Sequence, residues 1–255
     1  MRIARTVAGS ALVFAAVFGV WQWVTASGLI SPILLPSPLD TLRFLRDSFF
    51  DGMLTEAFLV TLRRLVVGYM MGLGLGVLMG LMLYRSPIAR NTLGLAALGL
   101  QTLPSVCWSP LAILWFGQTE QAMYFVVIMG SVWAMSIAVE NAIRAVPPQY
   151  VRAARVMGSR GAHTWRTVIF PAALPQLVAG AKLCWAFSWR SLMSAEIYIT
   201  IIDRMGLGQL LHFGRELNAM DQVMGVMLVI IAVGLVIDRF AFVPLERRMR
   251  RLRGL

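Results

Sequence analysis

Long apolar stretches recur along the chain, and each has about the length of a membrane-crossing helix. They cover residues 7–26, 57–84, 91–116, 123–142, 176–199 and 220–242. A helix of about 20 apolar residues crosses the roughly 30 Å hydrocarbon core of a bilayer and satisfies its own backbone hydrogen bonds there. The pattern therefore predicts an all-α integral membrane protein with about six transmembrane helices.

The first stretch has a second interpretation. Residues 1–28 combine a basic start, an apolar run and a small-residue end, which is also typical of a secretory signal peptide. The apolar run from Val7 to Ala26 is long for a signal peptide and matches the length of a span. We expect it to be retained as the first transmembrane helix.

Composition supports a membrane protein and argues against nucleic-acid binding. Hydrophobic residues make up 58% of the 255-residue chain and charged residues 14%, whereas soluble domains carry about a quarter charged residues. The net charge of +11 comes without a recognised nucleic-acid-binding motif. Cys107 and Cys184 lie in apolar stretches without a second thiol or histidine at metal-ligand spacing, so no metal site is expected.

The arginines between the apolar stretches indicate the orientation, because basic segments are retained on the cytoplasmic side. With the N-terminus inside, the cytoplasmic segments hold Arg2, Arg5, Arg85, Arg90, Arg144, Arg152, Arg155, Arg160, Arg166, Arg247, Arg248, Arg250, Arg251 and Arg253. The opposite segments hold Asp40, Asp47, Asp51, Glu56, Glu120, Asp203, Glu216 and Asp221, against Arg43, Arg46, Arg204 and Arg215. This asymmetry predicts that both termini are cytoplasmic.

Residues 31–53 separate the first two apolar stretches. Pro32, Pro36 and Pro38 precede an amphipathic run, which predicts an extended external segment followed by a helix lying at the membrane interface. We therefore divide the chain into two parts. Residues 1–56 form an N-terminal transmembrane helix with a periplasmic interfacial segment, and residues 57–255 form a core domain with a cytoplasmic loop at 143–175.

Glycines recur every four residues in the second stretch and form a bare ridge along one helical face. They are Gly68, Gly72, Gly76 and Gly80. Such ridges let helix backbones approach closely in lipid, where packing replaces the hydrophobic effect as the driving force. The ridge is interpreted as a helix-packing surface, with a sliding surface as the alternative.

Two prolines interrupt the third stretch. Pro104 and Pro110 each remove a helical hydrogen bond, and the polar residues Ser105, Trp108 and Ser109 fall between them. Broken backbone at membrane depth is tolerated mainly where it is covered by protein or lines a watery cavity. The break is a candidate part of a translocation path, and an ordinary proline kink is the alternative.

Polar residues also gather in the fifth stretch, where charges are costly and usually face the protein interior or a pathway. Lys182 lies near the inner end and can reach the interface. Arg190 lies deeper, and its planar donor fork suits the oxygens of nitrate, a sulfonate or bicarbonate. The alternative is a structural ion pair, either with Glu196 or across a dimer interface. The candidate path residues here are Trp185, Ser188, Arg190, Ser191, Ser194 and Glu196.

The long loop from Val146 to Leu177 predicts two short helices with a turn between them. Pro147 and Pro148 suit a helix start, and Gly158 suits the left-handed conformation that closes a helix. A second short helix is expected to end near Ile169, before Pro171 and Pro175 lead into the fifth span.

The same loop resembles a known family. Ala153-Ala154, three residues, Gly158 and then Phe170-Pro171-Ala172-Ala173-Leu174-Pro175 are similar to the EAA loop of binding-protein-dependent ABC importer permeases. Further fragments in the same order are LPSP, TLRR, ILWFG, GLGQLL and LERR, which together resemble the nitrate, sulfonate and taurine branch. The resemblance implies the type I importer permease fold in a bacterial inner (plasma) membrane.

In that family, the first short helix of the loop docks on an ATPase subunit. The resemblance therefore implies that the coupling residues are Arg152, Ala153, Ala154, Met157, Gly158, Pro171 and Pro175. Small residues there let two backbones approach. The family commonly has Glu where this chain has Arg152, so the charge at this position of the docking helix is reversed.

The chain itself is not expected to be an enzyme. Its single lysine, Lys182, does not stand in a GxxxxGK[ST] phosphate-binding loop, and His163 and His212 belong to no catalytic constellation. This chain should bind no cofactor, and a partner ATPase should use the ATP and Mg.

The implied partners are a second copy of the permease, two ATP-binding subunits, a periplasmic or lipid-anchored binding protein and the bilayer. The expected cargo is a small anion such as nitrate, an alkanesulfonate or taurine. The outer segment from Gly206 to Arg215 is expected to meet the binding protein. An ion-driven carrier or channel and a membrane-bound enzyme are the alternatives. Internal inverted repeats and, apart from Glu196, a buried acid for ion coupling are not found to support the carrier. No cluster of acids, histidines or nucleophiles at one membrane depth supports the enzyme.

Overall fold

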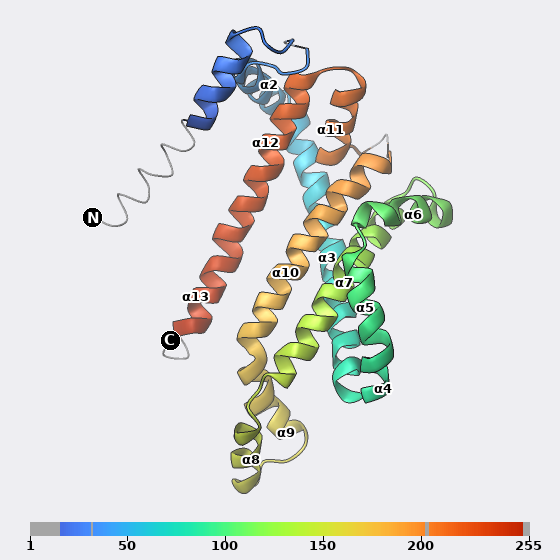
Figure 1. Cartoon of the computed structure of the whole chain (residues 1–255), viewed down its shortest axis with the longest axis vertical. Helices are drawn as coiled ribbons and strands as arrows, with labels where there is room; N and C mark the ends of the chain where they lie inside the picture. The colour runs from blue at the N-terminus through green and yellow to red at the C-terminus, as the bar shows by residue number, and fades with distance from the viewer. Residues whose placement is uncertain (1–15, 32, 202–203, 252–255) are drawn as a thin grey trace, which may run out of the picture. The chain divides into compact units, whose positions relative to one another are not determined.

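The computed structural model describes residues 16–31, 33–201 and 204–251, and within these ranges its regular structure is entirely helical (Figure 1). Residues 16–26 are helical. The labelled α-helices are α2 (Pro38–Phe50), α3 (Met53–Arg85), α4 (Pro87–Ala89), α5 (Leu95–Thr102), α6 (Ser109–Phe116), α7 (Glu120–Arg144), α8 (Pro148–Val156), α9 (Ala162–Thr164), α10 (Phe170–Tyr198), α11 (Leu207–Glu216), α12 (Met220–Ile237) and α13 (Val243–Arg251). A 3-10 turn covers Ser105–Trp108, and π-helical turns cover Arg90–Gly94, Trp165–Ile169 and Asp238–Phe242.

Long apolar helices confirm the predicted fold class. Within the described residues, four helices have the length and hydropathy to cross a membrane: Met53–Arg85, Glu120–Arg144, Ala162–Tyr198 and Met220–Met249. They correspond to the predicted spans at 57–84, 123–142, 176–199 and 220–242. Of the predicted first span, residues 7–15 lie outside the described part of the chain.

The predicted third span is a bent pair of helices. Residues 87–102 and 105–116 meet at 105°, as a broken span or a re-entrant loop. Leu103 has an extended backbone, with φ −69° and ψ 123°. The residue before a proline is disfavoured in the helical region, so Pro104 accounts for the break at this position. If the pair counts as one crossing, the described chain has up to 5 spans.

The second short helix of the 146–177 loop does not end before Pro171, contrary to the prediction. Residues 162–198 form one continuous 37-residue helix, with Pro175 inside it. The π-helical turn at Trp165–Ile169 directly precedes this proline-containing region. Local π adjustments accommodate the backbone groups that prolines leave free in membrane helices, so the helix continues.

The described residues group into two compact units. One contains residues up to Val60 together with Arg204–Ala232, and the other contains Thr61–Asp203 together with the segment from Val233 onward. The predicted division at residue 56 lies near the first of these boundaries. The return of residues 204–232 to the N-terminal unit was not expected from the sequence.

The N-terminal unit is held by α2, α11 and the first part of α12. Ser37 caps α2 by accepting a hydrogen bond from the backbone N–H of Asp40, and this helix matches the predicted amphipathic run. A Cβ added to Gly225 of α12 would lie 2.7 Å from the ring of Phe44 in α2. The Gln222 side chain donates to the Leu210 carbonyl at 2.7 Å, which joins α12 to α11.

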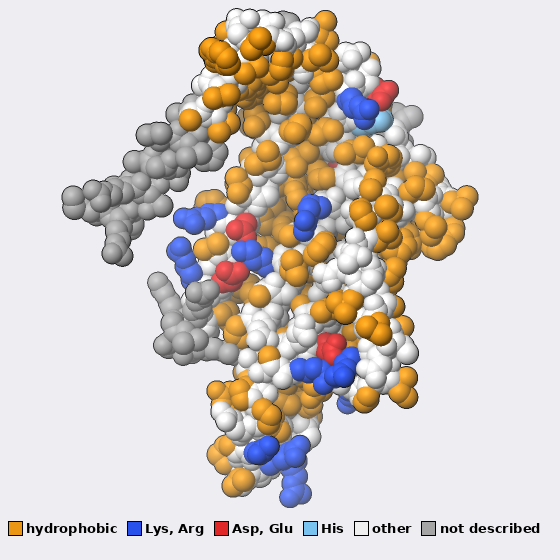
Figure 2. Space-filling model, viewed as in Figure 1, with side chains coloured by type: hydrophobic (Ala, Val, Ile, Leu, Met, Phe, Trp, Pro, Cys, Tyr) orange, Lys and Arg blue, Asp and Glu red, His pale blue; other side chains and the backbone are white. Residues whose placement is uncertain are grey.

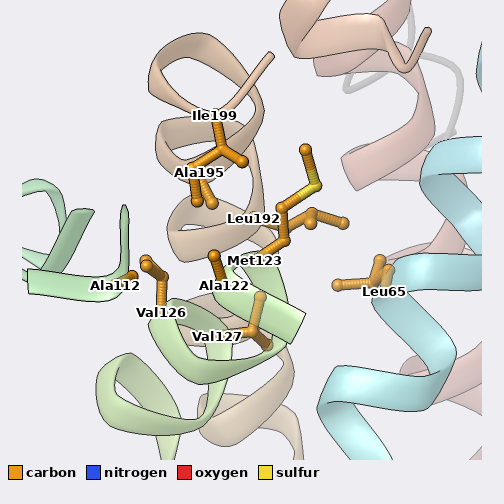
Figure 3. Close-up of a cluster of buried hydrophobic side chains, with 9 residues drawn as sticks. All are labelled: Leu65, Ala112, Ala122, Met123, Val126, Val127, Leu192, Ala195 and Ile199. Carbon is orange, nitrogen blue, oxygen red and sulfur yellow. The ribbon is translucent and has the colours of Figure 1, made fainter. Parts of the chain in front are cut away.

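The larger unit has its core where α3, α6, α7 and α10 meet. Figure 3 shows the buried cluster, in which side chains from the four helices point toward one another. Its members are Leu65, Ala112, Ala122, Met123, Val126, Val127, Leu192, Ala195 and Ile199.

The glycine ridge of α3 lies against α7. Cβ atoms added to Gly68, Gly76 and Gly80 would lie 2.7, 2.6 and 2.6 Å from atoms of α7, and one on Gly72 would meet the Ser131 hydroxyl. Gly74, on another face of the same helix, has nothing within 4 Å. The four ridge glycines thus occupy positions of close helix contact.

Candidate functional site

The loop between α7 and α10 is a projection built on α8. Gly158 has φ +85°, and the Ser159 N–H donates to the Ala154 carbonyl at 2.9 Å, which closes the helix in a C-terminal cap. The hydroxyls of Ser159 and Thr164 are 2.9 Å apart and join α8 to α9. The predicted helix and the left-handed glycine are therefore both present.

The outward surface of α8 is partly apolar. Val156 is 89% exposed and Met157 81% exposed, whereas Ala154 is 2% exposed and faces its own loop. Arg152, Ala153 and Gly158 are also exposed. Figure 2 shows Lys and Arg side chains gathered at the tip of this projection. The sequence prediction omitted Val156, and the available signal was its place at the end of the predicted short helix, directly before Met157.

The two prolines of the predicted coupling set lie in the first turns of α10. Pro171 is exposed and Pro175 is half-buried. Both line a recess of about 720 Å³ together with Pro147 and Tyr150 at the start of α8. The recess joins the base of the projection to the beginning of the long helix.

The polar residues of the proline break meet α7 and α10. Ser191 of α10 packs directly against Gly130 of α7, and the Ser105 Cβ would be 3.5 Å from a Cβ on that glycine. Small residues thus allow three backbones to converge at the break. Trp185 lies elsewhere, edge-to-face with Tyr69 at 5.2 Å between ring centroids.

Several buried donors near this convergence lack a hydrogen-bond partner within the described residues. They are the indole N–H of Trp108 and the hydroxyls of Ser109 and Ser191. Ser188 is also buried, on the same helix as Ser191. Buried polar groups without partners are costly and few in native proteins. Ser194, the remaining predicted serine, is half-buried.

Arg190 is exposed on α10 and does not pair with Glu196, so the first form of the structural alternative is wrong, while a pair across a dimer interface stays a prediction. Its Nε donates to the Ala186 carbonyl at 3.0 Å, and its guanidinium carbon lies 4.7 Å from the Phe187 ring centroid. No ion pair of Arg190 occurs within residues 16–31, 33–201 and 204–251. Residues six apart lie about 120° apart around a helix, so Arg190 and Glu196 face different directions.

Glu196 pairs instead with Arg64 of α3. Arg64 Nη1 lies 3.1 Å from Glu196 Oε1, and both side chains have 0% exposure. The Thr61 hydroxyl donates to both carboxylate oxygens at 3.1 and 3.0 Å. Arg64 Nε also contacts Glu120 Oε1 at 3.4 Å, so the arginine bridges α10 and α7.

The sequence prediction did not recognise Arg64 as a buried charge. Its spacing offered a signal, because Arg64 stands four residues before Gly68 and continues the glycine ridge toward α7. Lys182 also has acidic partners: its Nζ lies 2.7 Å from Asp238 Oδ1 and 3.4 Å from Glu246 Oε1.

Comparisons with known proteins agree with this geometry. The profile of the family described as "Binding-protein-dependent transport system inner membrane component" matches residues 72–251. The putative aliphatic sulfonates transport permease protein of Bacillus subtilis (strain 168) is 27% identical over 94% of this chain and 86% of its own length. The taurine transport system permease protein of Escherichia coli (strain K12) is 25% identical over 99% and 92%. The nitrate import permease protein of Synechocystis (strain PCC 6803) is 26% identical over 90% and 85%.

A solved structure supports the fold. An inward-facing form of the MetNI methionine ABC transporter has a chain that matches with a TM-score of 0.62 and 22% identity, over 74% of this chain and 93% of that chain. The chain described here belongs to the family of binding-protein-dependent transport system inner membrane components. It is an ABC importer permease of the branch that includes nitrate, sulfonate and taurine permeases, which confirms the predicted family and fold.

Proposed function

We propose that this chain is the transmembrane subunit of an ATP-driven importer that passes a small anion such as nitrate, an alkanesulfonate or taurine into the cytoplasm. Two copies of the chain form the path, two separate ATP-binding subunits bind ATP and Mg, and a periplasmic or lipid-anchored binding protein delivers the solute. The basic segments, including the α8 projection, lie in the cytoplasm with both termini.

The observation that carries this proposal is the position of Arg190. It stands within the membrane-crossing helix Ala162–Tyr198, is exposed in the single chain and has no acidic partner in the described residues. A charged side chain at membrane depth faces the interior of a bundle or a water-filled cavity rather than lipid. The Arg190 face of α10 is therefore covered by a second copy or by the solute path, and a guanidinium there suits an oxyanion.

A second copy of the chain would cover the Arg190 face of α10, which a single chain leaves exposed. Arg190 already contacts the Phe187 ring and the Ala186 carbonyl, which fix the side chain on the outer surface of α10. Two such faces across a symmetric pair place two guanidinium groups along one path. Access to it alternates between the two sides of the membrane as the ATP-binding subunits close and open.

Replacing Arg190 by glutamine should lower solute uptake about ten- to hundredfold, because a hydrogen bond to a charged group contributes about 1.5–3 kcal/mol. Uptake of labelled nitrate, methanesulfonate and taurine into proteoliposomes containing the full complex measures this. Arg190→Lys should keep part of the activity, since it retains the charge but loses the planar fork. Arg43→Gln, at an exposed position of α2, is the matched control. Full uptake of every probe by Arg190→Gln contradicts the proposed path.

The proposed ATPase contact is the exposed side of α8, where Val156 and Met157 form an apolar surface patch. Ala154 is buried and supports the helix from inside, while Ala153 and Gly158 leave room for close approach. Arg152 is exposed on the same helix.

Met157→Asp should release the ATP-binding subunits, because a carboxylate would be buried in an apolar contact. The tagged chain is purified in mild detergent, its partners are identified by mass spectrometry, and ATP hydrolysis is assayed. We expect loss of the subunits from the variant and retention in Arg160→Gln, a control in the same loop. A wild-type chain that transports solute without any ATP-binding subunit would instead favour an ion-driven carrier or channel.

A further inference from the structure

Two recesses lie next to each other at the end of the bundle where α8 projects. One is apolar, and the other is lined by arginines. The first, called the apolar groove, has a volume of about 430 Å³ and no polar lining. Its walls include Leu73 and Val77 of α3, Met135 and Val139 of α7, and Leu177 and Ala181 of α10. All six belong to membrane-crossing helices, so the groove lies at hydrocarbon depth.

The second recess, called the arginine pocket, has a volume of about 400 Å³. Arg144, Arg152, Arg155 and Tyr84 line it. Ile143 and Ile169 line both the groove and the pocket, so the two recesses are neighbours. An apolar groove thus lies directly beside a basic site.

The arginine pocket carries net positive charge. Arg144 is neutralised by Glu140, with Nε and Oε1 2.8 Å apart, and lies over the Tyr84 ring. Arg152 and Arg155 form no ion pair within the described ranges. Two guanidinium groups therefore remain available to an anion.

We propose that the groove and the pocket together bind one anionic glycerophospholipid, such as phosphatidylglycerol. An acyl chain occupies the apolar groove, and the phosphate contacts Arg152 and Arg155. Basic pockets between membrane helices are suited to anionic headgroups. An acidic side chain of a partner protein would explain the arginines but would leave the adjoining apolar groove unfilled, so the combined chemistry favours a lipid.

Trp165 provides a probe, because its side chain lines the groove. The full chain is placed in nanodiscs of phosphatidylcholine and phosphatidylglycerol, with brominated acyl chains on one lipid or the other. The contribution of Trp165 is obtained by subtracting the fluorescence of the Trp165→Phe variant from that of the parent chain. We expect brominated phosphatidylglycerol to quench this signal more strongly than an equal fraction of brominated phosphatidylcholine.

Arg152→Gln and Arg155→Gln should each lower the preference for phosphatidylglycerol about fivefold, since each basic residue near the surface contributes about 1 kcal/mol. Arg160→Gln, an exposed arginine of the same loop outside the arginine pocket, should leave it unchanged. Ala181→Phe, which fills the groove, should abolish it.

Equal quenching by the two lipids would overturn the proposal. The proposal would also be overturned if the preference for phosphatidylglycerol survives Ala181→Phe and is removed by excess inorganic phosphate. In that case the arginine pocket binds a free anion rather than a lipid. Equal quenching together with loss of the ATP-binding subunits from Arg152→Gln would assign the arginines to a protein contact. The fluorescence assay needs neither ATP nor solute, so its failure leaves the importer proposal untouched.

Discussion

Arg64→Met should destabilise the protein by about 3–5 kcal/mol, the usual cost of removing one partner from a buried ion pair. The change leaves the Glu196 carboxylate, which has 0% exposure, without the guanidinium at 3.1 Å. It also removes one of the two arginine contacts between α3 and Glu120 of α7. Unfolding of the purified full chain in mixed micelles, followed by circular dichroism, measures the free-energy difference.

Two further variants make this result specific. Arg63→Met removes an arginine whose side chain is 57% exposed and whose contact with Glu120 is 3.4 Å, so its effect should stay below about 1 kcal/mol. The double variant Arg64→Met/Glu196→Met should recover much of the lost stability, because the buried guanidinium and the buried carboxylate are removed together. A loss in Arg64→Met no larger than that in Arg63→Met would contradict the role assigned to this ion pair.

Gly80→Ala should destabilise the contact between α3 and α7 by about 1–3 kcal/mol, the typical cost of overpacking. The new Cβ would lie 2.6 Å from the Ser136 carbonyl oxygen and 2.6 Å from the Val139 Cβ. A backbone oxygen cannot rotate away as a side chain does, so the helices must separate. The same unfolding measurement detects the loss.

Gly74→Ala is the matched control on the same helix. Nothing lies within 4 Å of the added Cβ, and alanine favours a helix over glycine by about 1 kcal/mol. The control should be neutral or slightly more stable than the parent chain. Equal responses at Gly74 and Gly80 would show that helix propensity, rather than close packing, governs the ridge.

Features that depend on local backbone chemistry were predictable from the sequence. Pro104 ends a helix at the residue before it, and Gly158 adopts a positive φ at the end of α8, as the residue types require. The period of four in the α3 glycines likewise indicated a single contact face. These inferences need only the neighbours along the chain.

Pairings between helices were not predictable in the same way. Glu196 is six residues from Arg190 and 132 residues from Arg64, yet the distant arginine is its partner. Helical phase excludes the near pair, but it does not identify which other helix supplies the cation. The continuity of residues 162–198 also escaped prediction, because two prolines indicated a break that the π-helical turn accommodates.

That continuity places the α9 turn, which adjoins α8, and Arg190 on one and the same helix. A 37-residue helix is about 55 Å long, so a tilt of about 5° about one end moves the other by about 5 Å. The two positions on this helix where bending is expected, the π-helical turn and Pro175, both lie near the α9 end. The segment from residue 176 to Arg190 is therefore expected to move as one piece.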